Sequence, residues 1–399
     1  MRKKSSDIGI NISQTIVVLL LFYTLQGHAN DKISITSIDS LSLSQFNNRD
    51  WDKLIATGKL AQKHNIDFKW LQQRVGYAYF VKKQYYKSMQ HYEKALTYDL
   101  TDEISHLYLY YIGLNTGRTA FARFHAAALS DATSAYLDLK QYKLLDAVDL
   151  EYSYKIPEYT ATHDATYKRF GLNSEIGYKF NLYQSYSDFN QHTDTTQIRQ
   201  HEYFVLLGWN VSAKTNISIG YHYVGSRVIL STDKSFYPGN IFFSKITQQV
   251  NRFDLSLSGA TFNNEWINSK QLGVHLGISF AGKNNIGLTS SYYRILESGL
   301  DYSYGRNVFK QTAGIMLFNR LWTEACVNFG NLNQFIDNNG LYFYNSLDPT
   351  TFRTGISGFW YVFKPLTVYL NYTFDTKQII INRTSYHQHS ITGGIIWKI

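Results

Sequence analysis

The sequence contains very little cysteine and proline, few charges, and no long apolar run beyond its first 30 residues. A single cysteine, Cys326, cannot form an internal disulfide. Because no cysteine lies near the N-terminus, a lipoprotein anchor is not expected either. Soluble sheets use proline and charge to protect their edges, yet the chain has 4 prolines among 399 residues and 17% charged residues. A helical membrane protein needs apolar runs of roughly 20 residues, so that class is excluded as well.

Aromatic residues, in contrast, are abundant. The chain has 33 Tyr, 25 Phe and 7 Trp, while its mean hydropathy is only −0.28. This combination suits long strands in which apolar residues alternate with polar ones. The formal charge of +9 is spread along the chain without a basic block, so no nucleic-acid partner is expected.

The N-terminus has the features of a secretory signal peptide. Arg2, Lys3 and Lys4 precede the apolar stretch at 15–25, and small residues follow at 27–29. We expect a signal peptide over 1–29 and a linker over 30–49. The alternative is an N-terminal anchor helix that is retained.

Helical periodicity over 50–137 predicts a small helical domain. The segment 70–100 resembles a tetratricopeptide repeat, although Ser88, Leu100 and Gln72 depart from its usual residues. The positions that match its packing residues are Gly76, Tyr79, Tyr85, Tyr92 and Ala95. A weaker unit follows over 104–129. Two units are fewer than a free-standing solenoid requires, so the domain is expected to pack against something else.

From residue 145 to the end, the hydrophobic period changes to two. In QLGVHLGISF (271–280), Leu276 and its apolar neighbours alternate with His275, glycine and serine. Successive strand residues face opposite sides, so one face is apolar and the other polar. Repetition of this pattern predicts a mainly β protein, a transmembrane antiparallel β-barrel of about 12–14 strands whose apolar face contacts lipid. The alternative is a soluble sandwich or a large lipid-binding barrel.

The connections between these strands differ in length. Tight turns are expected at 213–215, 281–285, 319–322 and 364–365, and longer external loops at stretches such as 335–350. An even strand count requires one extra, weak strand within 224–250. The N-terminal helical domain then lies on the same side as the C-terminus, in the periplasm. Tyr292, Trp360 and Trp397 are candidates for interfacial girdles.

The last eight residues, TGGIIWKI, resemble the C-terminal targeting signal of bacterial outer-membrane barrels. The matching positions are Thr392, Gly394, Trp397 and Ile399, with Ile399 standing where an aromatic residue is usual. The full layout resembles the YaiO family of outer-membrane β-barrel proteins. A more distant analogue is the exopolysaccharide exporter built from tetratricopeptide repeats and a pore. The resemblance implies a bacterial outer-membrane location, with membrane lipid and the barrel-assembly machinery as partners.

Polar residues on the inward face are the candidate lumen lining. They are Glu151, Lys155, Glu175, His222, Asp254, His275, Glu324 and Arg353. Structural ion pairs, a transport lining and catalysis are the three interpretations of this set. No catalytic, metal or cofactor motif is present. We expect a transport or export pore for a polysaccharide or solute, whose repeats dock a periplasmic protein or polymer. The alternatives are a plugged structural barrel and a lipid-modifying enzyme.

Overall fold

The computed structural model describes residues 33–399, apart from 231–232, 282–284, 300, 347 and 381. The expected signal peptide therefore lies outside the described residues. The chain forms two compact units that divide between Asp67 and Phe68, inside the expected helical domain. In the part of the chain that the structure describes, no helix has the length and apolarity needed to span a membrane.

The described part of the first unit, residues 33–67, contains two helices, α2 (Ile35–Asn47) and α3 (Trp51–Lys63). The expectation of a linker over 30–49 is therefore wrong for most of that segment. Its serine-rich composition is typical of a loop, but Ser34 and Ser37 form a capping box that satisfies backbone N–H groups at the start of α2. The edge-to-face contact of Phe46 with Trp51 joins the two helices.

The second unit begins with five helices: α4 (Lys69–Val81), α5 (Tyr85–Leu96), α6 (Glu103–Asn115), α7 (Thr119–Ala126) and α8 (Asp131–Tyr136). Close packing joins α4 to α5 and α6 to α7. A Cβ at Gly76 would lie 3.1 Å from the Tyr92 ring, and one at Gly113 would lie 2.7 Å from Ala122. The small residues in α4 and α6 thus allow each helix to approach its partner closely.

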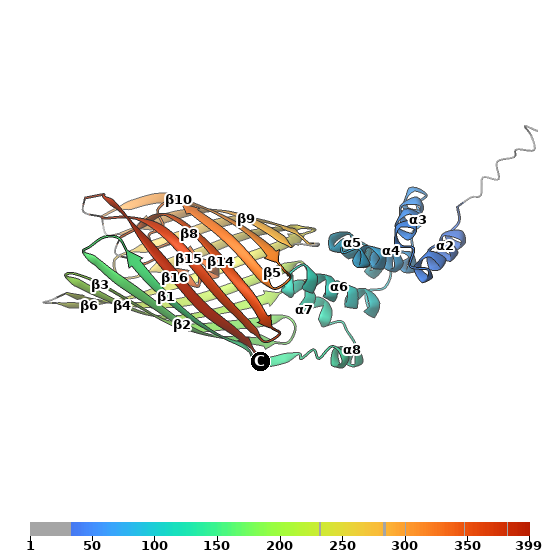
Figure 1. Cartoon of the computed structure of the whole chain (residues 1–399), viewed down its shortest axis with the longest axis horizontal. Coiled ribbons are helices and arrows are strands. Elements are labelled where there is room, and N and C mark those ends of the chain that lie inside the picture. Colours follow the sequence, from blue (N-terminus) through green and yellow to red (C-terminus); the bar gives the residue numbers. More distant parts are fainter. Residues whose placement is uncertain (1–32, 231–232, 282–284, 300, 347, 381) are drawn as a thin grey trace, which may run out of the picture. The chain divides into compact units, whose positions relative to one another are not determined.

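The rest of the second unit is a closed antiparallel barrel of fourteen strands, shown in Figure 1. Its strands are β1 (Tyr142–Pro157), β2 (Thr162–Ile176), β3 (Phe180–Thr193), β4 (Thr196–Asn210), β5 (Thr215–Leu230), β6 (Lys234–Val250), β7 (Phe253–Asn263), β8 (Asn268–Phe280), β9 (Ile286–Ser298), β10 (Ser303–Leu317), β11 (Leu321–Phe329), β14 (Thr350–Phe363), β15 (Leu366–Gln378) and β16 (Ser385–Lys398). Each strand pairs with its neighbour in the chain, and β1 pairs with β16. Closure leaves no edge strand, so the backbone groups of the wall are satisfied within it.

The two ends of the barrel differ in their connections. The end that holds the C-terminus and the tight turns, including 211–214 and 364–365, is called the near end below. The opposite end is called the far end. The extra strand expected within 224–250 is confirmed as β6. The strands are long on both sides of the far connections, which are therefore short except for 330–349. Because β1 starts beside the end of β16, the chain passes from α8 into the barrel wall at the near end.

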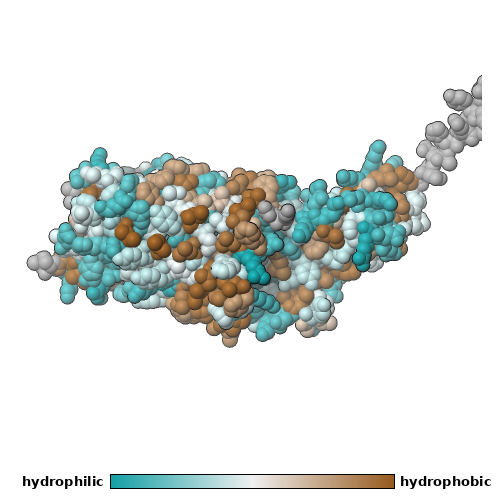
Figure 2. Space-filling model, in the orientation of Figure 1, coloured by the Kyte–Doolittle hydropathy of each residue, from teal (hydrophilic) through white to brown (hydrophobic). Residues whose placement is uncertain are grey.

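The outer surface of the barrel is apolar over much of its height. Leu276 is 41% exposed on the outside, whereas the adjacent His275 points inward and contacts Ser258 and Ser291. Tyr292, Trp360 and Trp397 are also exposed. Figure 2 shows apolar residues gathered over the barrel face and hydrophilic ones at the far tips of the strands. This exterior fits a hydrocarbon solvent, because a soluble protein rarely exposes so continuous an apolar surface.

Candidate functional site

A long connection between β11 and β14 folds into the barrel interior. This segment, residues 330–349, is called the lumenal loop below; it contains β12 (Ile336–Asp337), the 3₁₀ turn η1 (Asn338–Gly340) and β13 (Tyr342–Phe343). The expectation of an external loop over 335–350 is therefore wrong. Its asparagine- and glycine-rich composition is typical of solvent-exposed loops, but its apolar residues find buried partners on distant strands.

Two apolar clusters hold the lumenal loop against the wall. Ile336 and Phe343 pack with Val224, Ile241, Phe243, Ala260 and Phe262 of β5, β6 and β7. Leu332 and Phe335 pack with Tyr293, Ile295 and Val308 of β9 and β10. Gly340 has φ +93, and a Cβ there would lie 3.1 Å from Phe243, so the tight turn at the loop tip requires glycine.

Polar contacts fix the loop at further points around the wall. Lys310 forms an ion pair with Asp337 at 2.7 Å, and Gln271 both donates to and accepts from the backbone of Ile336. His222 Nδ1 lies 2.9 Å from the Gly340 carbonyl oxygen, and its Nε2 lies 3.2 Å from Glu202. These contacts occupy both ring nitrogens of His222, which leaves neither to activate a nucleophile.

Glu151 of β1 is the centre of a buried polar cluster below the loop tip. It accepts hydrogen bonds from Arg169 at 2.9 Å, from Tyr342 of the lumenal loop at 3.0 Å and from Tyr369 at 2.6 Å. Gly394 lies between Glu151 and Tyr369 in the sheet, and a Cβ there would come within 2.3 Å of the Tyr369 ring. The glycine thus lets Tyr369 cross the strand to reach the carboxylate.

The other residues of the C-terminal motif have distinct positions on β16. The Thr392 hydroxyl donates to Ser153 at 2.8 Å inside the barrel, while Trp397 lies outside, edge-on to Phe363. The backbone N–H of Ile399 donates to Asp146 at 2.8 Å. These residues close the barrel against β1; recognition of the motif by assembly machinery remains a prediction.

A polar cavity of about 440 Å³ runs beside the lumenal loop. Its lining includes Glu151, Lys155, Glu324 and Arg353 from the predicted set. It extends along β15 from Tyr369 to Lys377, about eight residues, which corresponds to roughly 26 Å at ~3.3 Å per residue. Cys326 also lines it. A smaller cavity, of about 210 Å³, is lined by His275, Lys310 and Asp337, among others.

Two predicted lumen residues do not lie deep in the barrel. They lie at its near mouth, where helices contact the wall. Asp254 pairs with Arg118, which directly precedes α7, at 3.1 Å, and Glu175 pairs with Arg123 of α7 at 3.3 Å. A third pair joins Lys214 in a near turn to Glu93 of α5 at 2.8 Å. The helices are thus attached to the near end by charge pairs and by Ala213 and Ala281, which pack on their core.

Several charged residues that complete the lumen are not among those predicted from the sequence. Arg169 pairs with Glu151, Lys310 with Asp337, Arg306 with Glu297, and Asp375 with Arg353. Strand alternation predicts an inward side chain for five of the residues that were missed: Arg169, Arg306, Lys310, Asp375 and Lys377. No local signal placed Asp337, because it belongs to the lumenal loop. Among the residues that the structure describes, no group of three His, Cys, Asp or Glu side chains could hold a metal.

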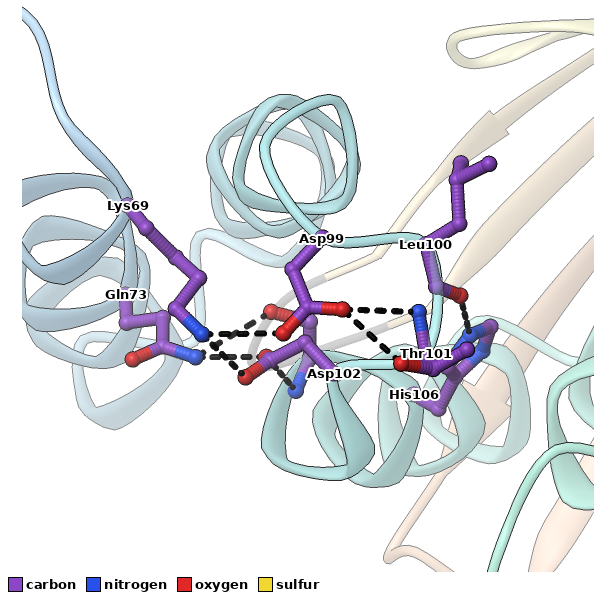
Figure 3. A network of polar contacts seen from close by, with 8 residues as sticks. Lys69, Gln73, Asp99, Leu100, Thr101, Asp102 and His106 are labelled. Atoms are coloured by element: carbon purple, nitrogen blue, oxygen red, sulfur yellow. Dashed lines mark hydrogen bonds and ion pairs between the residues drawn. The ribbon is translucent and has the colours of Figure 1, made fainter.

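The residues matched to a tetratricopeptide repeat lie in the interior of the helical region. Tyr79, Tyr85, Tyr92 and Ala95 are buried, and Ser88 donates to the Gly76 carbonyl oxygen at 2.8 Å. Figure 3 shows a polar network that links α4 to the start of α6: Lys69 pairs with Asp99 at 3.0 Å and with Asp102 at 3.5 Å. The hydrogen bond from Lys69 is the main cause that lowers the pKa of Asp99.

A buried histidine pair joins α6 to α7. His106 Nε2 lies 3.0 Å from the Leu100 carbonyl oxygen, which only accepts, so His106 Nδ1 accepts from His125 Nδ1 at 2.9 Å. Burial, together with the neighbouring His106, lowers the pKa of His125 to about 3. The His125 ring is therefore neutral in the helical core at neutral pH.

Comparisons with known proteins found only solved structures of low similarity. No family model matches the sequence, and no curated protein matches it. Similar solved structures include the CymD monoaromatic hydrocarbon channel, with 10% identity over 67% of this chain and 93% of that chain and a TM-score of 0.45. Another is the Pseudomonas putida toluene transporter TodX, with 8% identity over 71% and 93% and a TM-score of 0.42. At these identities and TM-scores, the similarity does not define a function.

Proposed function

We propose that this protein is a bacterial outer-membrane channel whose polar passage runs between the lumenal loop and the wall of β14, β15, β16 and β1. The continuous cavity beside the loop carries this proposal. It follows β15 for most of the strand length and is lined by charged and amide side chains. An apolar exterior with a polar interior is the general construction of outer-membrane pores. The lumenal loop narrows the passage, which favours a selective channel over a wide one.

The helical domain belongs in the periplasm in this proposal, because it enters the barrel at the end that holds the C-terminus. Tyr98, Leu100 and Ile104, in and near the connection between α5 and α6, are at least 48% exposed. Exposed apolar residues beside an ion-pair network suit docking of a periplasmic protein or polymer. The tetratricopeptide-like repeats and the relationship to the YaiO family remain predictions within this account.

A second candidate function is a plugged barrel that docks partners without transport. The observation that favours it is the attachment of the lumenal loop on many sides: Glu151, His222 and Gln271, on β1, β5 and β8, all contact the loop. A loop held at so many points opposes displacement. The two candidates differ in whether the cavity beside the loop conducts.

Single-channel recording of the purified chain in planar bilayers tests the proposal. The channel predicts discrete conductance steps that are smaller than those of an unobstructed barrel of this strand number. Absence of any steps from protein that has inserted, shown by a heat-modifiable gel band, would support the plugged barrel and overturn the channel.

A further inference from the structure

We propose that Lys155, Arg353 and Lys377 form a selectivity site for solutes that carry an oxyanion, a carboxylate or a phosphate. The inference rests on the proposed channel and names the solute class that it favours. The three cations come from β1, β14 and β15 and line the same cavity. In the sheet, Arg353 pairs with Asp375, which is two residues from Lys377, and Lys155 pairs with Ser390 of the adjacent strand β16.

The positive charge of this cluster is only partly neutralised. Asp375 binds Arg353 with both oxygens, at 2.5 and 2.6 Å, and is fully buried behind it. Lys377 donates to two neutral oxygens of the lumenal loop, the Ser346 hydroxyl and the Asp348 carbonyl. The Lys155 side chain lines the cavity and makes no hydrogen bond or ion pair with any residue that the structure describes. Among the described residues, Asp375 is the one whose carboxylate hydrogen-bonds to any of these three cations. An anion entering the cavity would therefore give the two lysines a charged partner.

Most other carboxylates that line the cavity already have partners elsewhere. Glu151 is bound by Arg169, Asp337 by Lys310, and Glu202 by His222 and Ser187. Glu324 receives only a 3.4 Å hydrogen bond from the Trp322 indole, and it lies three residues from the near end of β11. Lys155 and Lys377 lie toward the far ends of their strands. The far half of the passage is therefore the positive one.

The geometry of the cluster suits reversible binding of a small anion. The Tyr344 ring stacks 4.5 Å from the Arg353 guanidinium, which together with Asp375 holds that side chain in place. Asn345 and Ser346 of the lumenal loop line the same cavity and add neutral polar groups. A volume of about 440 Å³ falls within the ~300–1,000 Å³ of small-molecule sites. Conduction requires binding weak enough for release, and the point charges of two lysines meet that requirement better than the bidentate guanidinium group of an arginine.

The test combines ion selectivity with binding. Reversal potentials across a KCl gradient are measured for the wild-type chain, for Lys155→Glu with Lys377→Glu, and for Lys270→Glu. Lys270 is an exposed lysine on the outer face of β8 near the far end, so it controls for net charge. We expect anion preference in the wild type, a reversal potential of opposite sign in the double variant, and no change in the control.

Titration calorimetry of the detergent-solubilised chain supplies the second readout, with gluconate, glucose 6-phosphate and glucose as probes. Gluconate carries a carboxylate and glucose 6-phosphate carries a phosphate, so the two probes show which oxyanion the site prefers. We expect at least one of them to bind. The double variant should weaken that binding at least tenfold, and glucose should not bind. Steps that show no anion preference, together with no binding of either anion, would overturn the site while leaving the channel intact. Absence of steps would overturn the channel alone, because the titration still reports on the site.

Discussion

The Tyr342 hydroxyl of the lumenal loop donates to both carboxylate oxygens of Glu151, at 3.2 and 3.0 Å, although 191 residues separate them in the chain. The loop tip is thereby held to β1, the first strand of the barrel, after the chain has completed most of the wall. Buried hydrogen bonds to charged groups contribute about 1.5–3 kcal/mol each. The loop is therefore a fixed constriction of the lumen.

Replacing residues 335–345 by a short glycine-serine linker should widen the passage. The apolar clusters and the Tyr342–Glu151 bond would be lost, and single-channel conductance should rise several-fold. Replacing the far turn at Asp194 and Thr195 by Gly-Ser is the control, since both residues are exposed and neither lines the cavity, and it should leave conductance unchanged. An unchanged conductance in the lumenal-loop variant would show that the loop does not limit flow.

The same substitution at two adjacent residues of β15 should lower the stability of the barrel by very different amounts. Leu370 is 61% exposed on the outside, so Leu370→Arg puts a cation into the hydrocarbon at a cost of about 2–4 kcal/mol near the midplane. Asn371 lines the cavity and bonds to Ser357 at 2.7 Å, so Asn371→Arg should cost much less. Urea unfolding in lipid vesicles measures both. Equal losses would mean that the faces are wrongly assigned.

The His106–His125 pair should make the helical region sensitive to acid. Because the folded pKa of His125 is about 3, against an ordinary value of 6.5, the unfolded state alone takes up its proton between these values. The free energy of unfolding of the helical region is therefore unaffected by this group above pH 6.5. It falls by about 1.4 kcal/mol per pH unit as the pH decreases from 6.5 toward 3.

Melting of the helical circular dichroism signal of the full chain measures this effect. The melting temperature should fall between pH 6.5 and pH 4. In His125→Gln the slope should flatten, because glutamine can donate to His106 without titrating. An equal slope in the wild type and the variant would contradict the assignment to this pair.

Deleting residues 50–135 should leave a folded, heat-modifiable barrel. The strand pairing is complete without the helices, which attach through charge pairs such as Arg118 with Asp254. The deleted chain should lose its periplasmic partner or cargo, detected by cross-linking in intact cells. Failure of the barrel to form would instead make the helices structural.

The barrel could be predicted from the sequence because strand alternation is a local pattern that repeats. Leu276 outside and His275 inside follow from parity alone, and β6 follows from the need for an even strand count. The site was harder to predict. Alternation predicts that Lys155 and Arg353 point inward. The cavity that they share, however, depends on the position of the lumenal loop inside the barrel. That position is set by contacts of Phe335 and Phe343 with strands distant in the chain.

The native Cys326 provides the most direct test of the central claim, since it lines the cavity that we propose as the passage. A negatively charged methanethiosulfonate reagent, added during single-channel recording, would attach a bulky sulfonate at this position. The account predicts a stepwise loss of current in the wild type and none in Cys326→Ser. Unchanged current in a wild-type chain that mass spectrometry shows to be fully labelled would place the conducting route elsewhere and contradict the account.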